Sequence, residues 1–117
     1  MVTRVDHIDM RVADLEETVT ALSRLGLQVL RRTQAPRSSV EMALPGADQV
    51  VFELRPAGED GRTGVHHIAF RQSGPEDVER LKAQGVSFLT EHTLIRATGR
   101  TVSSFADANG QVWQLTD

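Results

Sequence analysis

The sequence predicts an α+β fold of two tandem β-α-β-β-β modules, whose mixed sheets curve around a central cleft. The main observation is an internal repeat. VDHIDMR at 5–11 and VHHIAFR at 65–71 share Val, His, Ile and Arg at an offset of 60 residues, 65 − 5. Each copy precedes a segment of helical periodicity and further segments of strand character, which indicates one supersecondary unit used twice. With 117 residues, we expect a single domain, 1–117, with module one at 1–56, a linker at 57–64 and module two at 65–117.

The first module begins with a strand at 5–12 and continues into a helix. Asp14 is a suitable N-cap, and Glu17, three residues later, completes a capping box. Gly26 is a plausible stop. A strand at 27–31 follows, and then SSVEMAL and QVVFELR flank a turn at 45–48, which is typical of a hairpin. The apolar stripe of the helix is expected to comprise Leu15, Val19, Leu22 and Leu25.

The second module repeats this order. Pro75 suits a first helical turn, Val78 and Leu81 are expected to face inward, and Gly85 ends the helix. A strand is expected at 86–90, and the segment 91–100, which contains His92, is expected to be a loop. RTVSSFA and QVWQLTD then flank a second hairpin turn at 107–110.

Strand alternation separates an apolar face, expected to pack on the helix, from a more polar face. The polar face carries His7 and Glu53 in the first module, and His67 and Gln114 in the second. If the sheets curve towards each other, these four side chains converge. His66 has the opposite parity and is expected on the helix side, as a packed or surface residue.

Two imidazoles, a carboxylate and an amide oxygen suit a divalent transition metal such as Zn, Ni, Co, Mn or Fe better than Ca or Mg. Each residue alone would more often be an ordinary polar residue of a strand. Their equivalent places in a repeat favour the metal site. No motif suggests a redox cofactor.

Composition excludes several classes of partner. The net charge is −3, from 13 basic and 16 acidic residues that are interspersed, so we expect no nucleic-acid partner. No apolar run is long enough for a bilayer, and the first residues lack the apolar segment of a signal peptide. Cysteine is absent, which favours a reducing compartment. We therefore expect a cytoplasmic protein whose partner is a small molecule.

Four segments resemble the vicinal oxygen chelate superfamily, which includes glyoxalase I, methylmalonyl-CoA epimerase, extradiol dioxygenases and bleomycin-resistance proteins. They are DHI at 6–8, ELRP at 53–56, GVHHIAF at 64–70 and FADANGQVWQL at 105–115. The last is similar to the family pattern F-x-D-P-D-G-N-x-x-E-L, and GVHHIAF looks most like the epimerase branch. The resemblance covers nearly the whole chain. It implies a homodimer, with ligands from one chain or two, and the metal ligands His7, Glu53, His67 and Gln114.

The resemblance implies a metal-dependent isomerase or lyase that acts on an oxygen-chelating substrate through a metal-stabilised enolate. Gln114 departs from the family pattern, in which Glu usually serves there as ligand and base, because an amide cannot usefully accept a proton. Glu53, at the symmetric position, is then the first candidate for proton transfer. Glu41 in SSVEMAL is the second, or else a solvated strand residue.

Two other functions stay open. His7, His67 and Glu53 would also suit an Fe(II) extradiol-type dioxygenase, although such relatives usually place the carboxylate on the last strand. A non-catalytic drug-binding protein is the third possibility, but such relatives usually lose the ligand histidines. Asp9, Arg11 and Arg71 could orient an anionic substrate or pair with one another, and we expect ion pairs among them.

Overall fold

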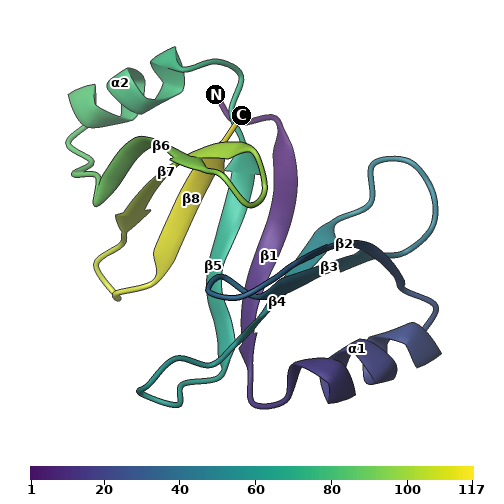
Figure 1. Ribbon diagram of the computed structural model, residues 1–117. Coiled ribbons are helices and arrows are strands. Elements are labelled where there is room, and N and C mark those ends of the chain that lie inside the picture. The colour runs from purple at the N-terminus through teal and green to yellow at the C-terminus, as the bar shows by residue number, and fades with distance from the viewer. The chain divides into compact units, whose positions relative to one another are not determined.

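The structure, a computed structural model, describes residues 1–117 and divides them into two compact units. The first unit is His7–His66, and the second comprises Met1–Asp6 and His67–Asp117. The division between the units falls inside strands β1 and β5, which are labelled in Figure 1. The elements in chain order are β1 (Arg4–Val12), α1 (Leu15–Arg24), β2 (Gln28–Thr33), β3 (Ser39–Ala43), β4 (Val51–Pro56), β5 (Gly64–Arg71), α2 (Glu76–Ala83), β6 (Thr90–Ile95), β7 (Arg100–Ala106) and β8 (Val112–Thr116).

The same strand order occurs twice. In the first half of the chain the order across the sheet is β2-β3-β4-β1, and in the second half it is β5-β8-β7-β6. The pairs β1/β4 and β5/β8 are parallel, and the hairpin pairs are antiparallel. The predicted α+β fold with two β-α-β-β-β modules and mixed sheets is confirmed.

Helix α1 covers the apolar face of the first unit's strands. It begins at the predicted cap, where Asp14 Oδ1 accepts the backbone N–H of Glu17 at 3.0 Å. Leu25 does not belong to the apolar stripe: the helix ends at Arg24, and Leu25 is 72% exposed as the C-cap. The buried core of this unit comprises Val12, Val19, Val40, Met42 and Leu54.

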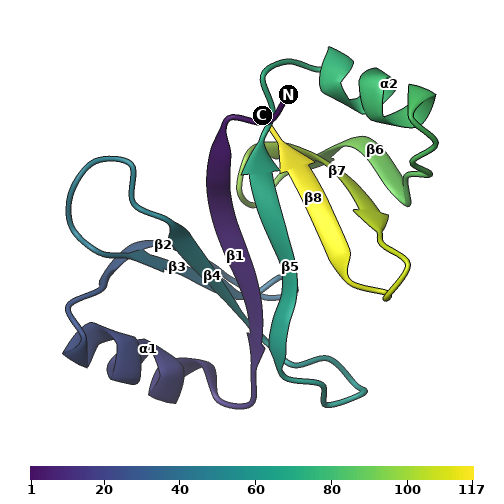
Figure 2. The same ribbon diagram turned by 180° about the vertical axis from the view of Figure 1, so that it is seen from behind.

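In the second unit, β8 lies between β5 and β7, and the two chain termini lie next to each other (Figure 2). Val78 of α2 is fully buried, as predicted. Aromatic rings pack within this unit, with Phe70 stacked on Trp113 at 6.1 Å between ring centroids. Neither helix, of 10 and 8 residues, is long enough to cross a membrane.

The strand predicted at 86–90 is wrong, because β6 is Thr90–Ile95. His92 therefore lies on a strand, not in a loop, and its φ is 47°. Its backbone N–H donates to the Ser103 hydroxyl at 2.9 Å, and the β6/β7 register shifts between Thr90 and Thr93. A bulge of this kind interrupts the alternation of side chains, so the strand shows no period of two in the sequence.

Candidate metal centre

His7 and Glu53 lie on adjacent parallel strands of the first unit. The β1/β4 register places His7 opposite Val51 and Asp9 opposite Glu53, so His7 and Glu53 are diagonal neighbours on one face. Both are buried, at 2% and 1% exposure. A ring nitrogen of His7 and a carboxylate oxygen of Glu53 lie within 4.8 Å of each other. The structure thus brings together one predicted ligand pair.

Glu53 has a charged partner that the sequence did not reveal. Arg37 Nη2 donates to both Glu53 carboxylate oxygens at 3.4 Å. Burial raises the pKa of the Glu53 carboxyl above its usual range, and this outweighs the opposing effect of the Arg37 charge. The neighbouring Asp9 carboxyl also raises the pKa of Glu53.

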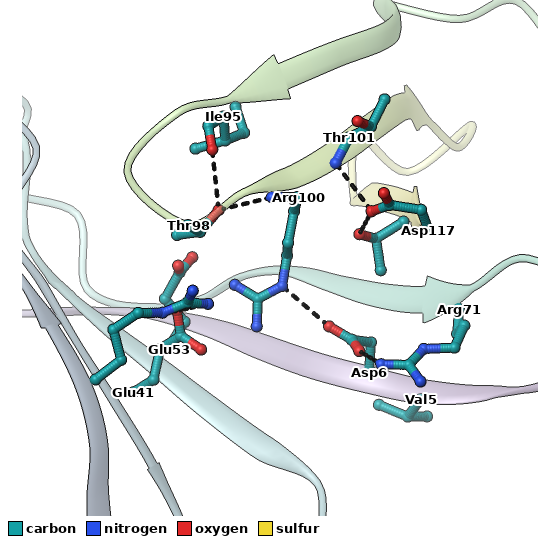
Figure 3. Close-up of polar contacts among 12 residues, drawn as sticks. Val5, Asp6, Glu41, Glu53, Arg71, Ile95, Thr98, Arg100, Thr101 and Asp117 are labelled. Atoms are coloured by element: carbon teal, nitrogen blue, oxygen red, sulfur yellow. Dashed lines mark hydrogen bonds and ion pairs between the residues drawn. The ribbon is translucent and has the colours of Figure 1, made fainter.

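Glu41 lies beside Glu53, in direct register across β3 and β4. Figure 3 shows both side chains, which come from these neighbouring strands. Glu41 is only 3% exposed, so the alternative of a solvated strand glutamate is wrong. Arg31 donates to its Oε2 from Nε at 3.0 Å and from Nη2 at 2.8 Å. Such a two-donor contact compensates a buried negative charge.

The second unit repeats the arrangement of the first. The β5/β8 register places His67 opposite Val112 and Ala69 opposite Gln114, so His67 and Gln114 are diagonal neighbours on one face. His67 is 7% exposed, and Gln114 is partly buried. Each unit therefore carries a histidine and a second donor in the same relation.

The predicted ion pairing of Asp9, Arg11 and Arg71 is confirmed with one change of partner. Arg11 Nε donates to Asp9 Oδ1 at 2.8 Å. Arg71 pairs with Asp6 in the second unit at 2.9 Å, and Arg100 Nε reaches the other oxygen of Asp6 at 3.2 Å (Figure 3).

His66 is an exposed residue, but it is not on the helix side. A ring nitrogen lies within 4.8 Å of a carboxylate oxygen of Asp9, which shares a face with His7. Partial burial lowers the pKa of His66, and the nearby Arg11 charge adds to that effect. Because His66 is exposed and lies near the start of β5, neighbouring side chains do not fix its ring. Strand alternation alone therefore does not predict where the ring lies.

Sequence reasoning missed Arg37 because it belongs to the connection between β2 and β3, which carries no motif. Arg55 did give a signal, since its parity places it on the face of Glu53.

The donors of the first unit fit a divalent transition metal. An imidazole nitrogen and a carboxylate oxygen, both buried, are the ligand types that these metals prefer. The Arg37–Glu53 contact, at 3.4 Å, is longer than the usual 2.7–2.9 Å of a strong charge-assisted bond. A cation at Glu53 would therefore replace a weak contact.

Comparisons with known proteins show which folds the chain resembles. The solved structures that it resembles include a methylmalonyl-CoA epimerase variant from Streptomyces coelicolor in complex with 2-nitronate-propionyl-CoA. The TM-score is 0.83 at 22% identity, with 99% of this chain and 97% of that chain covered. Methylmalonyl-CoA epimerase from Mycobacterium tuberculosis gives a TM-score of 0.80 at 22% identity, with 98% and 87% covered. Both likenesses concern the fold.

A search of the curated proteins gave no significant match. The family model described as Glyoxalase/Bleomycin resistance protein/Dioxygenase superfamily matches residues 4–115. That range contains both repeats and all four candidate ligands. The chain therefore belongs to the Glyoxalase/Bleomycin resistance protein/Dioxygenase superfamily.

Proposed function

We propose that this protein is a metal-dependent isomerase or lyase of the glyoxalase/epimerase type, with His7, Glu53, His67 and Gln114 as its metal ligands. The carrying observation is the buried His7–Glu53 pair, with donor atoms within 4.8 Å. The identical strand register of His67 and Gln114 supports their inclusion. We also propose a cytoplasmic homodimer, as the family resemblance implies.

The metal, when bound, supplies a Lewis acid for two adjacent substrate oxygens and so stabilises an enolate. In this proposal His7 and His67 hold the metal as neutral imidazoles. Gln114 contributes an amide oxygen, which leaves proton transfer to a carboxylate elsewhere.

Glu41 and Glu53 are the two candidate carboxylates for proton transfer, and both belong to the first unit. A carboxylate that donates to a metal is a weaker base, so we assign Glu53 to the metal and Glu41 to proton transfer. Glu41 lies opposite Glu53 in the sheet and is held at Oε2 by Arg31. Glu41 is buried, and exclusion of water strengthens the electrostatic interactions of such a group.

The test is solvent-deuterium incorporation at the acidic carbon of a substrate, followed by proton NMR in D₂O. The substrates are methylmalonyl-CoA, which one similar epimerase structure contains, and the hemithioacetal of methylglyoxal and glutathione. The metal-loaded protein is expected to exchange the proton of at least one of them. No exchange with either would contradict the proposal.

Two variants separate the assigned roles. Glu41→Gln should keep its metal and lose about 10²–10⁴-fold in exchange rate, the usual contribution of a general base. Glu53→Gln should lose metal as well as activity. A Glu41→Gln protein that exchanges at the original rate would exclude Glu41 as the base.

A further inference from the structure

Arg37 of the first unit carries a donor that the protein does not use. Its side chain is 26% exposed, and Nη2 makes the long contacts to Glu53. Nη1 is buried and has no hydrogen-bond partner. A buried N–H without an acceptor costs free energy that a native fold usually avoids. An acceptor supplied by a ligand would remove that cost.

A second arginine shows the same feature on the same face. Arg55 follows Glu53 by two residues on β4, and its Nε is also buried without a hydrogen-bond partner. Burial lowers the pKa of Arg55, and the nearby charges of Arg37 and Arg11 lower it further. Arg37 and Arg11 are thus close enough to Arg55 to repel its guanidinium group.

The acidic side chains in this cluster do not balance the arginines. Asp9 and Glu53 are the carboxyl groups whose charges act on Arg55. Three guanidinium groups therefore face two carboxyl groups, and the excess of positive charge favours an anion.

We propose that Arg37 binds a carboxylate of the substrate through Nη1, so that the substrate class is small acyl compounds with a free carboxylate. This deepens the proposed function, on which it rests. A guanidinium presents its donors in a plane that matches a carboxylate. The Arg37 guanidinium contacts Glu53 only through long Nη2 hydrogen bonds. It can therefore contact Glu53 and a substrate carboxylate at the same time.

The probe is malonate, titrated by calorimetry into the full chain as purified, with metal content measured on the same samples. Arg37→Gln should weaken malonate binding about tenfold or more, as expected for loss of a charge-assisted hydrogen bond. Arg62→Gln is the matched control, because that side chain is 89% exposed, and it should bind as the original protein does. Uncharged malonamide should not bind the original protein.

A His7→Ala background separates this proposal from the metal site. Adding Arg37→Gln there must still weaken malonate binding, whether or not metal is present. Far-UV circular dichroism checks that each variant is folded. If Arg37→Gln does not fold, Arg37→Lys takes its place. This variant must also bind malonate more weakly, because lysine lacks the planar donors of arginine. Equal malonate affinity with and without the Arg37 guanidinium, in folded protein, would overturn the proposal. That result is expected if Arg37 only neutralises Glu53.

Discussion

Asp6 is a buried carboxylate between two arginines of the second unit. It is 7% exposed, and Arg71 and Arg100 each donate to one of its oxygens. Its sequence neighbour His7 belongs to the first unit. Asp6 therefore connects the start of β1 to the end of β5 and the start of β7, immediately before a candidate metal ligand.

Replacing Asp6 with Asn should destabilise the protein by about 2–3 kcal/mol, because two guanidinium groups lose a buried counter-charge. The estimate is below the usual range because Arg71 is half exposed. Urea unfolding measures the change. Asp60→Asn is the control, since its pair with Arg62 is exposed and 3.8 Å long, and it should change stability by less than about 0.5 kcal/mol. Equal effects of both variants would contradict this account.

At the scale of elements, capping sets where α1 begins. Asp14 accepts the N–H of Glu17 in extended backbone geometry. Asp14→Ala should cost about 1 kcal/mol, and Asp14→Ser should retain most of the stability because Ser also caps. Thermal unfolding of the three proteins measures this. If Ser and Ala were equally destabilising, the side-chain cap would not be the cause.

The turn before β8 holds an acidic side chain with several donors. The Trp113 indole N–H donates to Asp107 Oδ2 at 2.9 Å, and the backbone N–H groups of Asn109 and Gln111 donate to Oδ1. The indole bond, with the backbone bonds, holds the pKa of Asp107 below its usual value despite partial desolvation.

A carboxyl whose pKa is lower in the folded state stabilises the fold above its unfolded pKa, near 4. That contribution should be lost as pH falls through the folded pKa of Asp107. Asp107→Asn should therefore show a smaller loss of stability than the original protein between about pH 5 and pH 2. Denaturant unfolding across this range measures it, and parallel pH profiles for the two proteins would contradict the assignment.

The elements also show where sequence reasoning works. The helices and the β3/β4 and β7/β8 hairpins follow from caps, periodicity and turn residues, which are local. The sequence predicts strand β6 too early in the chain, because a bulge at His92 breaks the alternation of side chains along it. Leu25 was placed in the α1 stripe because periodicity does not fix the last helical residue.

At the scale of the whole molecule, the repeat predicts which residues occupy equivalent places. It gave the fold class and the placement of His7 with Glu53 on one face, since both follow from parity and register. It could not give Arg37 beside Glu53, or the Arg31 pairing of Glu41, because these contacts depend on chain paths between elements. Strand alternation does not predict where the charged side chains of the connecting segments lie.

The central claim is that the histidines of the repeat hold a metal. Elemental analysis of protein purified without chelator tests it directly, beside the His7→Ala, His67→Ala double variant. We predict about one transition metal ion per site in the original protein and none in the double variant. An original protein that contains no metal, and takes up none when Zn, Ni, Co, Mn or Fe is supplied, would contradict it.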